Sequence, residues 1–180
     1  MALDSDNVRV AVTGAVYVAP TGSTAPSFSD DALDAAYLDL GYVSADGITE
    51  AIEKSTTQIR SWQDGSLVRE IVSDGTYTLS LTFIETNEEV VELYYGNALS
   101  SGELGIDPRA TGGRQSFVVD VIDGTSIERT YIPAGEITSV GERTLASGEA
   151  IGYEVTITAY ADADQDVATK FFSEFGSVES

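Results

Sequence analysis

The sequence predicts a mainly β protein, an antiparallel β-sandwich or flattened barrel with one flanking α-helix at about residues 87–95. The stretch Thr76–Phe83 alternates strictly between hydroxyl-bearing and apolar side chains, as in a strand with one buried face. Glycine-containing turn signals recur at short intervals, which is typical of antiparallel sheets. A single segment has clear helical periodicity, so the fold has one helix laid on a sheet.

The N-terminal part predicts two strands. Val8–Val12 alternates, and Ala15–Val18 continues it after a kink at Gly14. A second strand follows at Tyr37–Val43, and Asp46-Gly47 is a turn signal.

Residues 44–75 predict a long loop or hairpin excursion between two long strands. Ile48–Ser55 fits either a strand or a helix, and its Thr- and Ser-rich flanks favour a strand. Leu67–Val72 is a short strand, and Asp74-Gly75 is a second turn signal. Trp62, near the tip of the excursion, has two interpretations: it folds back to cover the core, or it anchors a partner.

The helix is predicted from its capping signals and its apolar stripe. Thr86 and Glu89 have the spacing of a capping box, and Gly96 can take the left-handed position after the last turn. The stripe consists of Val90, Val91, Leu93 and Tyr94. Residues 97–114 then predict a long glycine-rich loop, of a length that is usually functional or mobile.

The remaining strands follow the helix. Phe117–Val121 and Ile127–Ile132 flank a hairpin turn at Asp123-Gly124. Pro133-Ala134-Gly135 predicts a break, and Glu136–Leu145 predicts another strand.

The C-terminal part predicts one more strand and an arm. Residues 151–160 alternate clearly and complete a domain that spans residues 1–161. Residues 162–180 form an acidic arm, in which Val167–Phe175 fits a short helix. That helix would present Phe171, Phe172 and Phe175, docked either on this chain's own core or on a neighbouring subunit.

The strongest signal in the composition is charge. Thirty acidic residues face nine basic ones, which gives a net charge of −21. Such a surface disfavours binding to nucleic acid, which requires Lys and Arg, and to anionic membranes. Solubility, a surface past which nucleic acid slides, and adaptation to high salt all fit. The chain has no cysteine, which fits folding in a reducing compartment, and its acidic start is unlike a signal peptide.

No pattern for catalysis, a cofactor or a metal emerges from the residues. Without histidine or cysteine the chain lacks the usual nucleophilic dyads and the usual zinc ligands. No glycine-rich phosphate loop occurs. Asp162–Asp166 begins like a calcium loop, but Val167 and Ser173 stand where such a loop needs Gly and Glu. We therefore expect a protein that is not an enzyme and that carries no cofactor and no metal.

Several segments together resemble the major tail proteins, or tail tube proteins, of long-tailed bacteriophages with non-contractile tails. The resemblance lies in the following stretches: residues 1–20, Leu40-Gly41-Tyr42-Val43-Ser44, Ile59-Arg60-Ser61-Trp62-Gln63 and Glu85–Gly96. It implies a tail-tube-like β-sandwich with a flanking helix. It also implies a structural virion protein that self-assembles into stacked hexameric rings, the conduit for DNA ejection into the host.

The resemblance further implies partners and a location. The chain would bind itself and the tape-measure, tail-tip and tail-terminator proteins, and DNA would pass through the lumen without specific binding. It would contact no membrane, and it would be assembled in the host cytoplasm as part of the virion tail. The alternative function is a small acidic β-sandwich binding module, either a virion decoration or a surface adhesion domain.

Three groups of residues are candidates for contacts in such a tube. Candidate lumen-facing residues are Thr76, Thr78, Ser80, Thr82, Glu154, Thr156 and Thr158. Candidate contacts between rings are Arg60, Trp62, Gln63 and Asp64. Candidate arm contacts are Phe171, Phe172 and Phe175.

Overall fold

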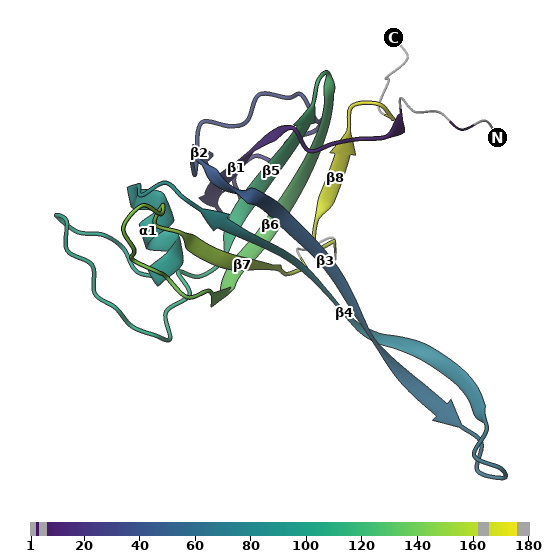
Figure 1. Cartoon of the computed structure of the whole chain (residues 1–180). Helices are drawn as coiled ribbons and strands as arrows, with labels where there is room; N and C mark the ends of the chain where they lie inside the picture. Colours follow the sequence, from purple (N-terminus) through teal and green to yellow (C-terminus); the bar gives the residue numbers. More distant parts are fainter. Residues whose placement is uncertain (1–2, 4–6, 162–165, 176–180) are drawn as a thin grey trace.

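The computed structural model describes residues 3, 7–161 and 166–175 (Figure 1). Within them the chain forms eight strands and one short helix, which confirms the mainly β prediction. The elements are β1 (Thr13–Pro20), β2 (Leu38–Asp39), β3 (Val43–Arg60), β4 (Leu67–Phe83), α1 (Glu88–Tyr95), β5 (Gln115–Asp123), β6 (Ser126–Val140), β7 (Tyr153–Ala159) and β8 (Thr169–Phe172).

All eight strands belong to one antiparallel sheet, in the order β2-β1-β5-β6-β7-β4-β3, with β8 added beside β6. β6 joins the two halves of this sheet, because its first part pairs with β5 and its last part with β7. The predicted break at Pro133-Ala134-Gly135 is therefore wrong. Pro133 falls where β5 has a register irregularity at Ser116, whose hydroxyl donates to the Pro133 carbonyl at 2.8 Å.

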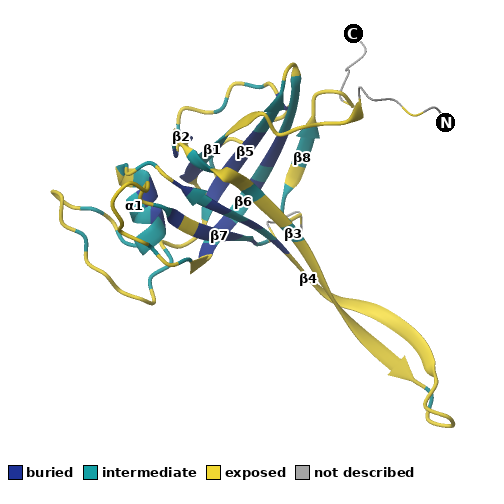
Figure 2. Cartoon of the chain, in the orientation of Figure 1, coloured by how far each residue is buried: buried dark blue, intermediate teal, exposed yellow. Residues whose placement is uncertain are grey.

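The core lies between the two halves of the folded sheet. Its buried strand residues are Val16 and Val18 of β1, Phe117 and Val119 of β5, Ile132 and Ile137 of β6, and the apolar residues of β4 and β7. The alternation of Thr76–Phe83 is confirmed, because its four apolar side chains are all buried. α1 covers one end of this core with Val90 and Leu93 (Figure 2).

The other face of β1 and β5 is covered by the loop between β1 and β2. An ion pair fixes that loop, since Arg129 of β6 donates to both oxygens of Asp120 of β5, from Nε at 2.7 Å and from Nη2 at 2.8 Å. The third nitrogen, Nη1, donates to the carbonyl oxygen of Asp31 in the loop at 2.7 Å. Hydrogen bonding to Asp120 outweighs burial and raises the pKa of the Arg129 guanidinium.

β3 and β4 run far beyond the body as a twisted two-stranded ribbon (Figure 1). We call residues 53–75 of this ribbon the arm. The turn lies at residues 61–66, so the turns predicted at Asp46-Gly47 and Asp74-Gly75 are wrong. Gly47 instead lies at a register irregularity within β3, with φ of 73°, and Gly75 pairs with Lys54 beside another one. The Asp46-Gly47 pair suits a bulge as well as a turn, because glycine readily adopts the positive φ of Gly47 in either.

Three further strand predictions need correction. Val8–Val12 is not a strand, because it has only isolated bonds such as Val12 N to Ile122 O at 3.2 Å. Gly14 lies within β1 and is not a kink: a Cβ there would meet the Asp120 carbonyl oxygen at 2.4 Å. The strand predicted at Tyr37–Val43 shrinks to β2, and the one predicted at Glu136–Leu145 ends at Val140.

The helix prediction is confirmed, with one change at its start. Asn87, and not Thr86, caps the helix, because Asn87 Oδ1 accepts from Val90 N at 2.8 Å. The hydroxyl of Thr86 instead hydrogen-bonds that of Tyr153 at 3.2 Å. Gly96 has the expected left-handed conformation, with φ of 67°.

The C-terminal helix predicted at Val167–Phe175 is wrong. Residues 169–172 form β8, which pairs antiparallel with residues 128–131 of β6. The free edge of β6 provides backbone hydrogen bonds that a short isolated helix would lack. The acidic C-terminal segment predicted at residues 162–180 is a different part of the chain from the arm, and it lies partly outside the described residues.

Candidate assembly surfaces

The outer face of β6, β7, β4 and β3 is a continuous polar surface, which we call the hydroxyl face. It contains all seven candidate lumen residues, on the side of β4 and β7 opposite the core. Cross-strand register places Thr78 beside Thr158 and Thr82 beside Glu154. The hydroxyls of Ser80 and Thr156 hydrogen-bond at 3.0 Å.

The register also adds residues to this face that the sequence alone did not reveal. Thr49 pairs with Ser80 and Glu53 with Thr76, while Glu136 pairs with Thr158 and Ser139 with Thr156. The face thus carries three glutamates, at 53, 136 and 154, and no basic residue among the positions named here. Strand alternation predicts the side of a strand, but only pairing predicts its neighbours.

Both lateral edges of this part of the sheet lack a second strand in the part of the chain that the structure describes. β3 pairs with β4 alone, and residues 136–140 of β6 pair with β7 alone. Free edges of this length are ready for pairing with another chain.

The arm beyond residue 55 has two different faces. One face carries Thr57, Ile59, Arg69 and Ile71, and the two isoleucines are 44% and 40% exposed. On the other face the side chains hydrogen-bond one another: Glu70 Oε1 accepts from Thr56 Oγ1 at 2.8 Å, and Gln58 Oε1 accepts from Arg60 Nη2 at 2.9 Å. Apolar surface is nevertheless exposed on both faces, because Val72 opposite Thr56 and Leu67 opposite Arg60 are 61% and 48% exposed.

The arm tip is a compact turn that presents Trp62. The Trp62 side chain is 96% exposed, so it does not cover the core. Asp64 organises the turn, because its carboxylate accepts from the Ser61 hydroxyl and from Ser66 N. These bonds, that of Ser61 first, lower the pKa of Asp64 to about 2.

β8 is attached to the body through Lys170. Its ammonium donates to Glu50 of β3 at 2.6 Å and to Glu128 of β6 at 2.5 Å. Burial opposes the charge of Lys170, but the bonds to the two glutamates outweigh it and raise the pKa. Of the three candidate phenylalanines, Phe171 is partly buried, whereas Phe172 and Phe175 are exposed.

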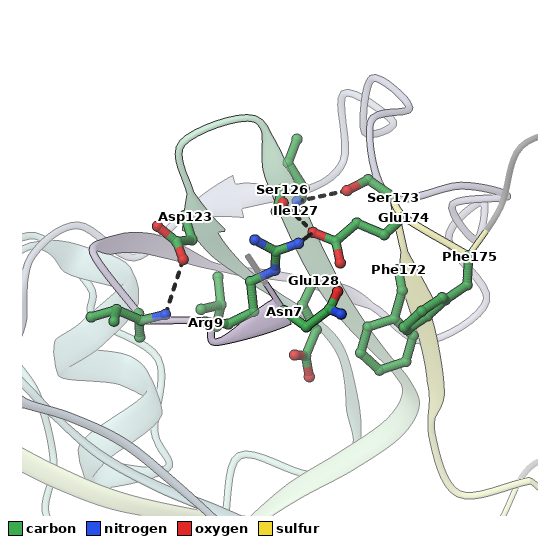
Figure 3. A pocket seen from close by; sticks show the side chains of 13 residues that line it. Asn7, Arg9, Asp123, Ser126, Ile127, Glu128, Phe172, Ser173, Glu174 and Phe175 are labelled. Carbon is green, nitrogen blue, oxygen red and sulfur yellow. Dashed lines mark hydrogen bonds and ion pairs between the residues drawn. The ribbon is translucent and has the colours of Figure 1, made fainter. Parts of the chain in front are cut away.

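A groove of about 620 Å³ lies where β8, the β5–β6 hairpin and the N-terminal segment meet (Figure 3). We call it the terminal groove. Its lining includes Val10, Ile127, Phe172 and Phe175. Its polar rim consists of Arg9, Asp123, Glu128 and Glu174, in which Arg9 pairs with Glu174.

The described residues contain no cluster of three or more metal-ligating side chains. Among them, no helix is long and apolar enough to cross a membrane.

Comparisons with known proteins give one family and several distant structures. The family model described as phage tail tube protein matches residues 1–175. No curated protein sequence matches the chain.

Similar solved structures include the tube-terminating cap of the anti-feeding prophage, at 12% identity over 94% of this chain and 98% of that chain, with a TM-score of 0.48. They also include the virion of a native gene transfer agent particle, at 13% identity over 78% and 92%, with a TM-score of 0.40. An Hcp protein matches at 10% identity over 87% and 96%, with a TM-score of 0.33. Because the family model spans residues 1–175, the chain belongs to the phage tail tube protein family, and it is a structural protein of the virion tail that forms the tube and not an enzyme.

Proposed function

We propose that six copies of this chain close into a ring, with the hydroxyl face lining the lumen. Tail tube proteins self-assemble into hexameric rings. The observation that carries the proposal is the position of the hydroxyl face: it lies on the part of the sheet that has two free lateral edges.

Ring closure uses those two edges. The free edge of β3 in one subunit pairs with residues 136–140 of β6 in its neighbour, so that six sheets become one barrel. A closed ring satisfies the backbone groups that both edges would otherwise leave unpaired. Because the two edges differ, the contact is heterologous and closes only through rotation about an axis.

The lumen lined this way is hydroxylated and acidic. The hydroxyl groups keep the lumen surface hydrated. The ring repeats three carboxylates that repel phosphate, those of Glu53, Glu136 and Glu154. Phosphate binding needs basic side chains that displace counterions, and the named positions have none. DNA thus passes through without specific binding.

Stacking of rings uses the parts that project from the body. The arm, with Arg60, Trp62, Gln63 and Asp64 at its tip, reaches the next ring. The exposed Phe172 and Phe175 contact a neighbouring subunit, and Phe171 packs within its own chain.

The tube belongs to a long-tailed phage with a non-contractile tail, an assignment supported by the four segments that resemble major tail proteins of such phages. Tape-measure, tail-tip and tail-terminator proteins complete the assembly in the host cytoplasm. No part of this scheme requires a membrane.

Negative-stain electron microscopy of the purified protein tests the proposal, first in low salt and then in added salt with magnesium. We expect rings with a central hole or hollow tubes. Cysteines introduced as Thr78→Cys and Thr156→Cys should react with a bulky maleimide in the monomer and lose that reactivity in tubes. Uniform small particles in every condition would favour the monomeric binding module, and undiminished labelling in tubes would remove these residues from the lumen.

A further inference from the structure

We infer that the terminal groove is the docking site for the arm tip of a second copy of this chain in the adjacent ring. The inference rests on the proposed function and deepens it by naming the surface that receives Trp62. Four observations support it: where apolar side chains are exposed, how charge is distributed along the chain, where the arm and the groove lie, and what lines the groove.

Exposed apolar side chains gather at two places. The arm exposes Ile59, Trp62, Leu67, Val68, Ile71 and Val72. The region of the terminal groove exposes Val8, Val10, Val12, Phe172 and Phe175. Large exposed apolar patches usually mark an interaction surface, and two patches on one self-assembling chain can cover each other.

The arm is nearly neutral, whereas the rest of the chain is strongly acidic. The arm, residues 53–75, contains three basic and four acidic residues, a net charge of −1. The remaining residues contain six basic and 26 acidic ones, a net charge of −20. The rim of the groove is acidic, with Asp123, Glu128 and Glu174 against Arg9, which pairs with Glu174, and the nearby Lys170, which pairs with Glu128. Arg60 and Arg69 on the arm therefore approach a surface of opposite charge.

The two surfaces lie well apart on the molecule. Figure 1 shows the arm leaving the body toward the lower right, while the β5–β6 hairpin and the end of β8 lie at the top. The eight residues from Glu53 to Arg60, at roughly 3.3 Å each, carry the tip about 26 Å along the ribbon. An arm and a groove on different parts of the chain make a heterologous contact, which repeats along an axis where its rotation does not close into a ring.

The groove has the shape and chemistry to receive an aromatic side chain. Phe172 and Phe175 both line the groove, and their rings are in contact, with centroids 5.7 Å apart (Figure 3). A tryptophan added edge-on to such a pair continues a favoured aromatic arrangement, and its N–H can reach a rim carboxylate. Aromatic and arginine side chains are the usual anchors of protein interfaces, and the tip offers both.

Intrinsic fluorescence tests burial of the tip directly, because Trp62 is the only tryptophan. We expect the emission of tubes to be shifted to shorter wavelength and to be quenched several-fold less by acrylamide than that of the monomer. Phe175→Ala should reverse both changes in any tubes that remain, whereas Ile106→Ala, a change of another exposed residue in the 97–114 loop, should not. Tubes in which Trp62 emission stays that of an exposed indole would overturn the inference.

Paired cysteines test the position, since the chain has no cysteine of its own. With Gln63→Cys at the tip and Asn7→Cys in the groove, a short bismaleimide should link copies into a ladder of oligomers. The matched control pairs Gln63→Cys with Ile106→Cys and should give no ladder. Tubes that form without the Asn7 ladder, or that link through Gln63→Cys alone, would overturn the groove while leaving the tube. A chain that makes no rings or tubes in any salt would overturn both.

Discussion

The body and the arm use the same strands and differ in what surrounds them. In β4, the segment from Tyr77 to Phe83 buries four apolar side chains to 7% exposure or less. In the same strand, Leu67, Val68, Ile71 and Val72 are between 40% and 64% exposed. Alternation and composition are similar, so the difference comes from the second layer that the body has and the arm lacks.

A two-stranded ribbon cannot bury its own side chains and is marginal in water by itself. The arm persists as an extension of a stable sheet, with its strand register set by the body and its turn tied by Asp64. Apolar residues on such a ribbon add nothing to the fold of one copy. We therefore expect these apolar residues to contribute to contacts between copies. The following substitutions separate effects on stability from effects on assembly.

Removing the arm should have the largest effect on assembly. Replacing residues 56–73 by an Asn-Gly turn joins Ser55 to Asp74, which already face each other. We expect no tubes, and a change in the free energy of unfolding of less than about 1 kcal/mol, because the deleted residues are surface-exposed. Circular dichroism melting and negative-stain microscopy measure the two. Tubes of normal length would show that the arm has another role.

Breaking the buried ion pair of the body should have the largest effect on stability. Asp120→Ala leaves the Arg129 guanidinium buried without its partner and should cost about 3–5 kcal/mol. The control is Asp107→Ala beside the exposed Arg109, which should change stability by less than about 0.5 kcal/mol. Urea unfolding gives both values. Equal losses at the two pairs would contradict the difference in burial.

A matched pair of truncations in one strand compares the two regions directly. Leu79→Ala in the body should cost about 2–5 kcal/mol, through lost burial and a residual cavity. Ile71→Ala in the arm should change the free energy of unfolding by less than about 0.5 kcal/mol and yet reduce tube yield. If Ile71→Ala destabilised the monomer as strongly as Leu79→Ala, the arm would have to pack on its own body.

The sequence predicts the body better than the arm because burial leaves a pattern and assembly does not. The strands at 76–83, 117–121 and 151–160 alternate against a core, and α1 has its capping signals, so these are confirmed. Asp46-Gly47 and Asp74-Gly75 were ambiguous between turn and bulge. Only the long-range pairing of β3 with β4 decides between them.

The predictions for the two ends of the chain were wrong for a related reason. Val8–Val12 has the alternation of a strand but only isolated backbone bonds, and residues 169–172 pair with an edge of β6 that no local pattern reveals. For the candidate surfaces, alternation was enough to place Thr76, Thr78, Ser80 and Thr82 on one face. Glu53 and Glu136 on that face were missed, because their position depends on the register between strands.

Salt should affect assembly and leave the body nearly unchanged. Stacking chains of charge −21 costs Coulomb energy, because the chains repel each other. The screening length of this repulsion falls from about 10 Å at 0.1 M salt to about 3 Å at 1 M salt. We expect tubes to lengthen several-fold with added salt or divalent cations, as measured on micrographs. The arm is nearly neutral, so its attraction to the acidic body is too weak to reverse this trend. Tubes that shorten on salt addition would show that attraction between arm and groove dominates repulsion.

Alkaline pH should give the smallest effect, and one confined to the body. Burial, the largest cause, raises the pKa of both Tyr37 and Tyr77 from 10 to about 12. The unfolded chain loses these protons near pH 10 and the folded chain only near pH 12, so stability is full below pH 10 and falls as pH rises toward 12. Chemical denaturation at pH 8 and 11 should show the loss, and Tyr77→Phe should diminish it, because the variant has one ionisable group fewer. An unchanged pH dependence in Tyr77→Phe would mean that Tyr77 ionises equally in the folded and unfolded states, and it would contradict the burial of the Tyr77 side chain.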